Sequence, residues 1–206
     1  MKFEKIVVVA LLFTVACAPT IKTKRVSGEE GDELAMSITD EWVAKDTSSA
    51  VDAILKKMDA HKKFQREFAN FEAKGKHPKL FVGEIRNNSS EAYFPIDDIN
   101  NEFLEKLDES GDFVLIDNSA RERILKEINY QNDGMVDPKQ AKSIGKQSGA
   151  DWMILGSIEM KAKILGGKTL KQYTLNIRIT DIQTSNEVFR GSYKTEKYSE
   201  KSGKGW

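Results

Sequence analysis

Two runs of alternating apolar residues near the C-terminal end constrain the fold more than any other feature of this chain. The first covers residues 158–164 and the second covers residues 173–179, with Gly166-Gly167 between them. Alternation with a period of two indicates strands that bury one face and expose the other. The glycine pair favours a turn, and Thr184–Asn186 gives a second turn before the apolar run Val188–Tyr193. The sequence therefore predicts an antiparallel C-terminal meander with one wet face.

Short apolar runs and helical patterns alternate before this meander. Buried strands are predicted at Leu80–Ile85, Phe113–Ile116 and Trp152–Leu155. Three amphipathic helices are predicted between them, each with a start or stop signal, at residues 96–107 before Gly111, 119–128 and 137–149. Strand–helix–strand crossovers favour parallel pairing, whereas hairpins demand antiparallel pairing. The predicted fold class is α/β, a mixed sheet of about four to five strands with helices packed on it.

Residues 33–74 carry apolar side chains at helical spacing. Two helices are predicted here, broken near Asp46–Ser49, and an aromatic stripe continues beyond them. The residues that define these patterns are Leu34, Ile38 and Trp42, then Val51, Ile54, Leu55 and Met58, and finally Phe64, Phe68 and Phe71. The predicted organisation is a helical segment 33–74 followed by an α/β domain 75–200.

The first sixteen residues have the pattern of a bacterial export signal. A basic start, Met1–Lys5, is followed by the apolar run Ile6–Ala16. Eleven helical residues reach only about 16 Å, roughly half of a hydrocarbon core of about 30 Å, so a permanent membrane span is disfavoured. Cys17, the only cysteine, follows directly. We therefore expect residues 1–16 to be a removed signal peptide and Cys17 to be lipidated, which also explains an odd cysteine.

The segment 17–32 is predicted to be a lipidated tether. It contains few apolar residues and cannot bury enough surface to fold on its own. The fifteen residues after Cys17 span at most about 50 Å when fully extended. Ala18 stands where an aspartate would favour inner-membrane retention in enterobacteria-like sorting. By resemblance to that system, the outer membrane is the expected destination, with the lipid as the only membrane attachment.

The sequence shows no constellation that would carry catalysis or hold a metal. His61 and His77 are its only histidines, and both lie among lysines, where solvated side chains are expected. No cluster has zinc-ligand spacing. The 32 basic and 32 acidic side chains balance, which disfavours nucleic-acid binding. We expect no enzymatic activity, no cofactor and no small-molecule substrate.

One segment resembles a known family. The Gly-x-Val-Asp-Pro motif at residues 134–138, the Gly-Ala-Asp at 149–151 before an apolar strand, and Gly156 at the end of that strand occur in the same order in the LpoB family of penicillin-binding protein activators. The resemblance covers about residues 75–200 and is specific across 130–156. Related folds, including the TolB N-terminal domain and the curli-secretion lipoprotein CsgG, share the capping and strand pattern elsewhere.

The resemblance implies a binding protein of the bacterial envelope. It implies an outer-membrane lipoprotein that faces the periplasm, binds a bifunctional penicillin-binding protein and activates peptidoglycan synthesis. The segment Ala18–Asp32 is much shorter than the tethers of the enteric members. The alternative is a lipoprotein for the assembly or secretion of a surface structure, such as a curli- or flagellum-type accessory protein.

A polar loop is the predicted partner-binding surface. It lies between two capped helices, which would brace exposed contacts. The alternative, weighed equally, is that this loop only positions Asp137 as a helix cap. The residues predicted to contact the partner are Tyr130, Gln131, Asn132, Asp133 and Met135.

Overall fold

The structure, a computed structural model, describes residues 25–116 and 149–201, together with their side chains except that of Glu84. The signal peptide, Cys17, the helices expected at 119–128 and 137–149, and the loop Tyr130–Met135 lie outside the described residues.

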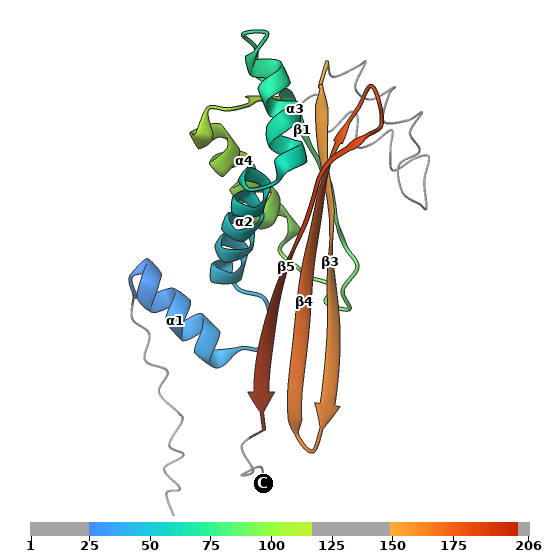
Figure 1. Ribbon diagram of the computed structural model, residues 1–206. Helices are drawn as coiled ribbons and strands as arrows, with labels where there is room; N and C mark the ends of the chain where they lie inside the picture. Colours follow the sequence, from blue (N-terminus) through green and yellow to red (C-terminus); the bar gives the residue numbers. More distant parts are fainter. Residues whose placement is uncertain (1–24, 117–148, 202–206) are drawn as a thin grey trace, which may run out of the picture.

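The described strands form one mixed sheet (Figure 1). Its order is β2 (Val114–Leu115), β1 (Lys79–Asn87), β3 (Trp152–Leu165), β4 (Lys168–Asp181) and β5 (Glu187–Glu200). β1 pairs in parallel with both β2 and β3, whereas β3, β4 and β5 pair antiparallel. The predicted mixed sheet and its antiparallel C-terminal meander are therefore confirmed.

The β3–β4 hairpin is longer than the alternating pattern predicted. Its register runs without interruption from Trp152↔Asp181 to Leu165↔Lys168. Gly166 and Gly167 both have positive φ, at 57° and 80°, which is the conformation of a tight two-residue hairpin turn. Because each strand has 14 residues, the hairpin projects well beyond the helical layer (Figure 1).

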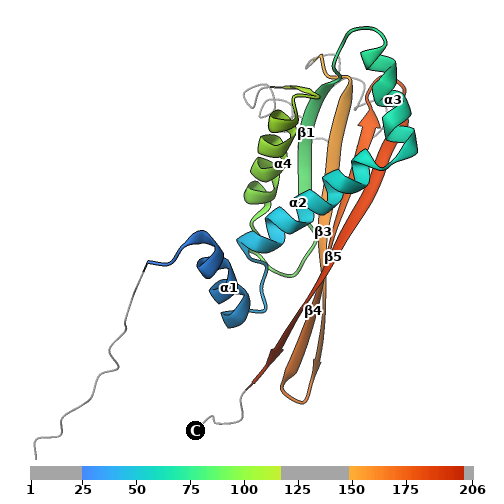
Figure 2. The same ribbon diagram turned by 60° about the vertical axis from the view of Figure 1, so that its left-hand side comes forward.

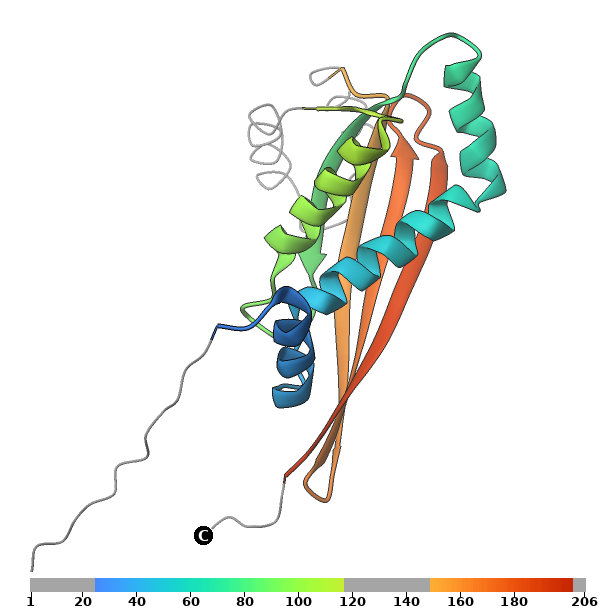
Figure 3. The ribbon, with the colours of Figure 1, turned by 90° about the vertical axis from the view of Figure 1, so that its left-hand side faces the viewer.

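Three helices cover one face of the sheet (Figures 2 and 3). They are α2 (Ala44–Asp59), α3 (Lys62–Glu72) and α4 (Ile96–Ser110). α4 ends at Gly111 in a left-handed conformation, as its sequence predicted. The main core lies between these helices and the sheet, and its largest fully buried side chains include Ile54, Phe103, Trp152, Tyr173 and Phe189. A smaller buried cluster on the opposite face contains Phe81, Ala150, Met153 and Ile182.

The N-terminal helices begin and end at other residues than predicted. α1 (Gly28–Ile38) begins inside the segment 17–32 that was expected to be a tether, because the Ser27 hydroxyl accepts a hydrogen bond from the Glu30 amide. The break before α2 lies at residues 39–43 and not at Asp46–Ser49. The Asp46 carboxylate accepts a hydrogen bond from the Val43 amide at 2.9 Å, which places it in the first turn of α2.

The stripe Leu34–Ile38–Trp42 does not form one helical face. Trp42 follows the end of α1 and is only 6% exposed, with its indole N–H donating to the Thr47 hydroxyl at 2.8 Å. Ile38 is 80% exposed, and no residue of α1 is buried. The four-residue spacing in the sequence therefore grouped side chains that lie in two different environments in the structure.

Gly156 lies within β3 and not at its end, and the close approach of β4 requires a residue without a Cβ. A Cβ at this position would lie 2.7 Å from the Asn176 carbonyl oxygen.

We expect Gly156→Ala to lower the free energy of unfolding by about 1–3 kcal/mol, because the two strands must separate locally. Gly28→Ala, with no atom within 4 Å of the new methyl, should change it by at most about 0.5 kcal/mol. Equal denaturant midpoints for the two variants would contradict this account.

Candidate functional site

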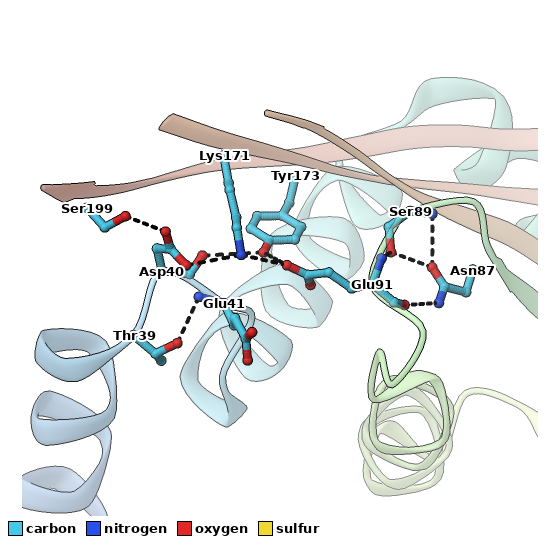
Figure 4. Close-up of polar contacts among 9 residues, drawn as sticks. All are labelled: Thr39, Asp40, Glu41, Asn87, Ser89, Glu91, Lys171, Tyr173 and Ser199. Carbon is cyan, nitrogen blue, oxygen red and sulfur yellow. Dashed lines mark hydrogen bonds and ion pairs between the residues drawn. The ribbon is translucent and has the colours of Figure 1, made fainter. Parts of the chain in front are cut away.

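A polar cluster fastens the projecting hairpin to two connecting segments on the helical side of the sheet (Figure 4). We call it the hairpin clamp, and it consists of Asp40, Glu91, Lys171, Tyr173 and Ser199. Lys171 and Tyr173 come from β4, and Ser199 comes from β5. Asp40 lies between α1 and α2, and Glu91 lies between β1 and α4. The clamp therefore joins parts of the chain that are far apart in sequence.

Lys171 is the centre of the clamp. Its Nζ atom lies 3.0 Å from Asp40 Oδ1 and 2.9 Å from Glu91 Oε1. The Tyr173 hydroxyl donates to the same Glu91 oxygen at 2.6 Å, and the Ser199 hydroxyl donates to Asp40. The side chains of Lys171, Asp40 and Glu91 are between 16% and 21% exposed. These ion pairs are therefore shielded from water more than ordinary surface pairs.

Local turns hold the two carboxylates in place. The Thr39 hydroxyl accepts the Glu41 amide at 3.1 Å, next to Asp40. On the other side, the Asn87 side chain accepts the Ser89 amide at 2.9 Å and donates to the Glu91 carbonyl at 2.7 Å (Figure 4). Asn and Thr side chains commonly make such bonds at turns. Hydrogen bonds within each loop therefore help to fix the positions of Asp40 and Glu91 independently of Lys171.

The electrostatics of the clamp suit fastening more than proton transfer. Hydrogen bonds from Ser199 and Lys171 hold the pKa of the Asp40 carboxyl below its usual range. Burial alone would lower the pKa of Lys171, but Glu91 and Asp40 outweigh it and raise that pKa. Burial and the hydrogen bond to Glu91 raise the pKa of Tyr173 far above its usual range. The tyrosine therefore stays a hydrogen-bond donor and cannot act as a base.

The opposite face of the same strands is polar and open. A hollow on this face is lined by Glu159 and Lys161 of β3, Gln172, Thr174 and Asn176 of β4, and Ser192 and Lys194 of β5. Within residues 25–116 and 149–201, no helix lies over this part of the sheet (Figure 1). In those same residues, no group of three or more histidine, cysteine or acidic side chains could hold a metal. The hollow presents both signs of charge and many neutral hydrogen-bonding groups, which suits binding more than catalysis.

Neither group of site residues predicted from sequence falls in the described part of the chain, since Cys17 and Tyr130–Met135 lie outside it. The sequence analysis missed the clamp, of which only the lysine could have been identified from the sequence. Lys171 occupies an inward register position two residues before Tyr173, where a charged side chain needs a partner.

His61 also differs from its prediction as a solvated residue. Its Nδ1 accepts the Phe64 amide at 3.2 Å and so caps α3, and its ring lies edge-on to Phe189 at 5.4 Å. His77 is exposed, as expected.

Comparison with known proteins identifies one family. The family described as peptidoglycan-synthase activator LpoB matches residues 46–195, which include Glu91, Lys171 and Tyr173. No curated protein matches the chain. Among solved structures, the LpoB C-terminal domain from Escherichia coli is 15% identical with a TM-score of 0.51, over 73% of this chain and 98% of that domain.

Two further solved structures are similar at lower TM-scores. The LpoB C-terminal domain from Salmonella enterica is 14% identical with a TM-score of 0.49, over 73% of this chain and 98% of that domain. The lipoprotein GNA1162 from Neisseria meningitidis is 15% identical with a TM-score of 0.47, over 59% of this chain and 84% of that chain.

Removing the cation of the clamp should destabilise the fold. Lys171→Met leaves two shielded carboxylates without their partner, and we expect the free energy of unfolding to fall by about 1–3 kcal/mol at neutral pH. Lys168→Met on the same strand is the matched control. Its pair with Glu200, at 3.6 Å, is more than half exposed and should contribute at most about 1 kcal/mol.

The pH dependence of stability provides a second readout. Because the folded pKa of Asp40 is depressed, its contribution is present above the ordinary value of 3.8 and is lost as the pH falls through the folded pKa. Lys171→Met removes one cause of the depression, so its unfolding free energy should fall less steeply than that of the wild type below about pH 4. Parallel pH profiles for the two proteins would contradict the role of Lys171.

Proposed function

The chain belongs to the LpoB family of peptidoglycan-synthase activators, and we propose that it binds and activates a bifunctional penicillin-binding protein. The family match over residues 46–195 is the observation that carries this proposal. The clamp supports it, because its ionisable groups are engaged in holding the fold. The protein then acts as a regulatory binding partner of an enzyme and not as an enzyme itself.

The proposed location is the periplasmic side of the outer membrane. Once the expected signal peptide 1–16 is removed, a lipidated Cys17 would attach the protein through lipid alone. No helix within residues 25–116 and 149–201 is long and apolar enough to cross a membrane. Since α1 begins at Gly28, the part of the tether that precedes helix is shorter than the sequence indicated.

Two surfaces are proposed for the synthase. The first is the loop Tyr130–Met135, proposed from sequence. The second is the polar hollow on the open face of β3, β4 and β5, whose lining includes Thr174 and Asn176. The clamp holds β4 and β5 from the opposite face of the sheet, so we expect the hollow to be ordered before a partner binds. A preorganised surface loses less conformational entropy when a partner docks.

A glycan-polymerisation assay tests both the activity and the surface. The mature chain without lipid, residues 18–206, should stimulate one of the bifunctional synthases of the same organism. Asn176→Arg places a long cation in the hollow and should weaken binding about tenfold, or ~1.4 kcal/mol. Asn70→Arg, the same substitution at an exposed position of α3, is the matched control and should leave stimulation unchanged.

The outcomes separate the proposed surfaces and functions. Loss of stimulation in Tyr130→Ala and Gln131→Ala, with full stimulation by Asn176→Arg, would place the interface on the loop. Stimulation of none of the synthases by folded wild-type protein would contradict the activator function and would favour the assembly or secretion alternative.

A further inference from the structure

The tip of the β3–β4 hairpin exposes bulky apolar side chains. Ile164 is 74% exposed and Leu165 is 84% exposed, at the last two positions of β3. Because neighbours along a strand point to opposite faces, the two side chains project on both sides of the tip. On the open face, Tyr198 of β5 is 57% exposed and is paired with Leu170. Apolar side chains on both faces of a protruding hairpin suit insertion into an apolar medium.

The hairpin itself carries charge of one sign near its tip, while β5 places Glu196 and Glu200 beside β4. Residues 160–171 contain Lys161, Lys163, Lys168 and Lys171, and no acidic residue. Of these, Lys171 is engaged in the clamp, and Lys168 lies 3.6 Å from Glu200. Lys161 and Lys163 are exposed and flank the apolar residues. Lysines around exposed apolar side chains are the composition of surfaces that bind anionic lipid headgroups.

The start of the described chain lies in the same half of the molecule as the hairpin tip, at about the level where α2 begins (Figures 1 and 3). From Arg25 back to Cys17 there are eight peptide units, which span at most about 29 Å. A lipid on Cys17 would therefore hold this half of the domain close to the membrane surface.

We infer that the hairpin tip, through Ile164, Leu165 and Lys163, rests on the lipid surface to which Cys17 is anchored. The inference depends on the lipid anchor of the proposed function, and it adds a second attachment that fixes orientation. α1 is less suited to this contact although Ile38 is exposed, because its first turn carries Glu29 and Glu30. Those carboxylates would be repelled by anionic headgroups.

This contact would also orient the domain relative to the membrane. A strand of 14 residues spans about 46 Å at 3.3 Å per residue. A domain that stands on its hairpin tip places α3 and the start of β1 at its far end, since β1 begins beside Trp152, opposite the tip. The hollow lies between the tip and that far end, so this contact would set its height above the membrane.

Position-specific quenching in vesicles tests the contact. With Cys17 acylated, an added cysteine is the only free thiol, so Leu165→Cys can carry an apolar environment-sensitive fluorophore. Lys74→Cys, in the turn after α3, is the matched control. The lipidated mature protein is placed in vesicles of phosphatidylethanolamine and phosphatidylglycerol that contain a headgroup spin label. We expect quenching of the probe at residue 165 to be several-fold greater than at residue 74.

A charge-reversed variant, and a comparison with contact to a second copy of the chain, complete the test. Adding Lys163→Glu to Leu165→Cys should reduce the difference while the protein still floats with the vesicles. Equal quenching at residues 165 and 74 in floating protein would overturn the inference. A probe response at residue 165 that depends on protein concentration and not on lipid would overturn it in favour of a second copy of the chain.

The test distinguishes failure of the inference from failure of the proposed function. Failure of the wild-type protein to float would contradict the anchor and overturn the inference with it. Synthase stimulation is measured separately in detergent, where the Lys163→Glu protein, changed outside the lining of the hollow, should match the wild type. Absence of stimulation there, with selective quenching in vesicles, would refute the activator function and leave the membrane contact standing.

Discussion

A lysine held between two carboxylates joins the projecting hairpin to the connecting segments on the helical side of the sheet. Lys171 points to the helical side of the sheet, where a lone cation would be costly, and Asp40 and Glu91 compensate it at 3.0 and 2.9 Å. Because these acids belong to two different connecting segments, one interaction fixes the exit of α1 and the loop after β1 against β4. The clamp lies where the apolar core ends and the hairpin begins to protrude. Polar contacts therefore hold the strands at this point, whereas apolar packing against the helices holds them in the core.

The two faces of the long strands consequently serve different purposes. The face toward the helices carries the buried side chains of Tyr173, Leu175 and Ile177. The clamp lies on the same face, next to this buried part and nearer the hairpin tip. The opposite face carries the polar hollow around Thr174, free of any described helix. A surface held from behind in this way suits an activator, which must present a defined shape to an enzyme. The proposed lipid contact at the tip would orient that surface relative to the membrane.

The sequence predicted the sheet well because strand pairing follows local patterns. Alternation along residues 158–164 and 173–179 with Gly166-Gly167 between them was sufficient for the hairpin, and Gly111 for the end of α4. The clamp was not predicted, because Asp40 lies 131 residues from Lys171 and no local pattern links them. The helix break near Asp46 was misplaced since its carboxylate was not read as a cap. Periodicity also could not show that Ile38 and Trp42 face different environments.

Photo-cross-linking in cells tests the central claim most directly, namely that the open sheet face of this family member docks on a bifunctional penicillin-binding protein. A photoreactive residue would replace Thr174 in the hollow, with Asn70 on α3 as the control position. The account predicts a cross-linked product that contains a bifunctional synthase from position 174 and none from position 70. Cross-links from position 174 only to other envelope proteins, or equal synthase cross-linking from both positions, would contradict it.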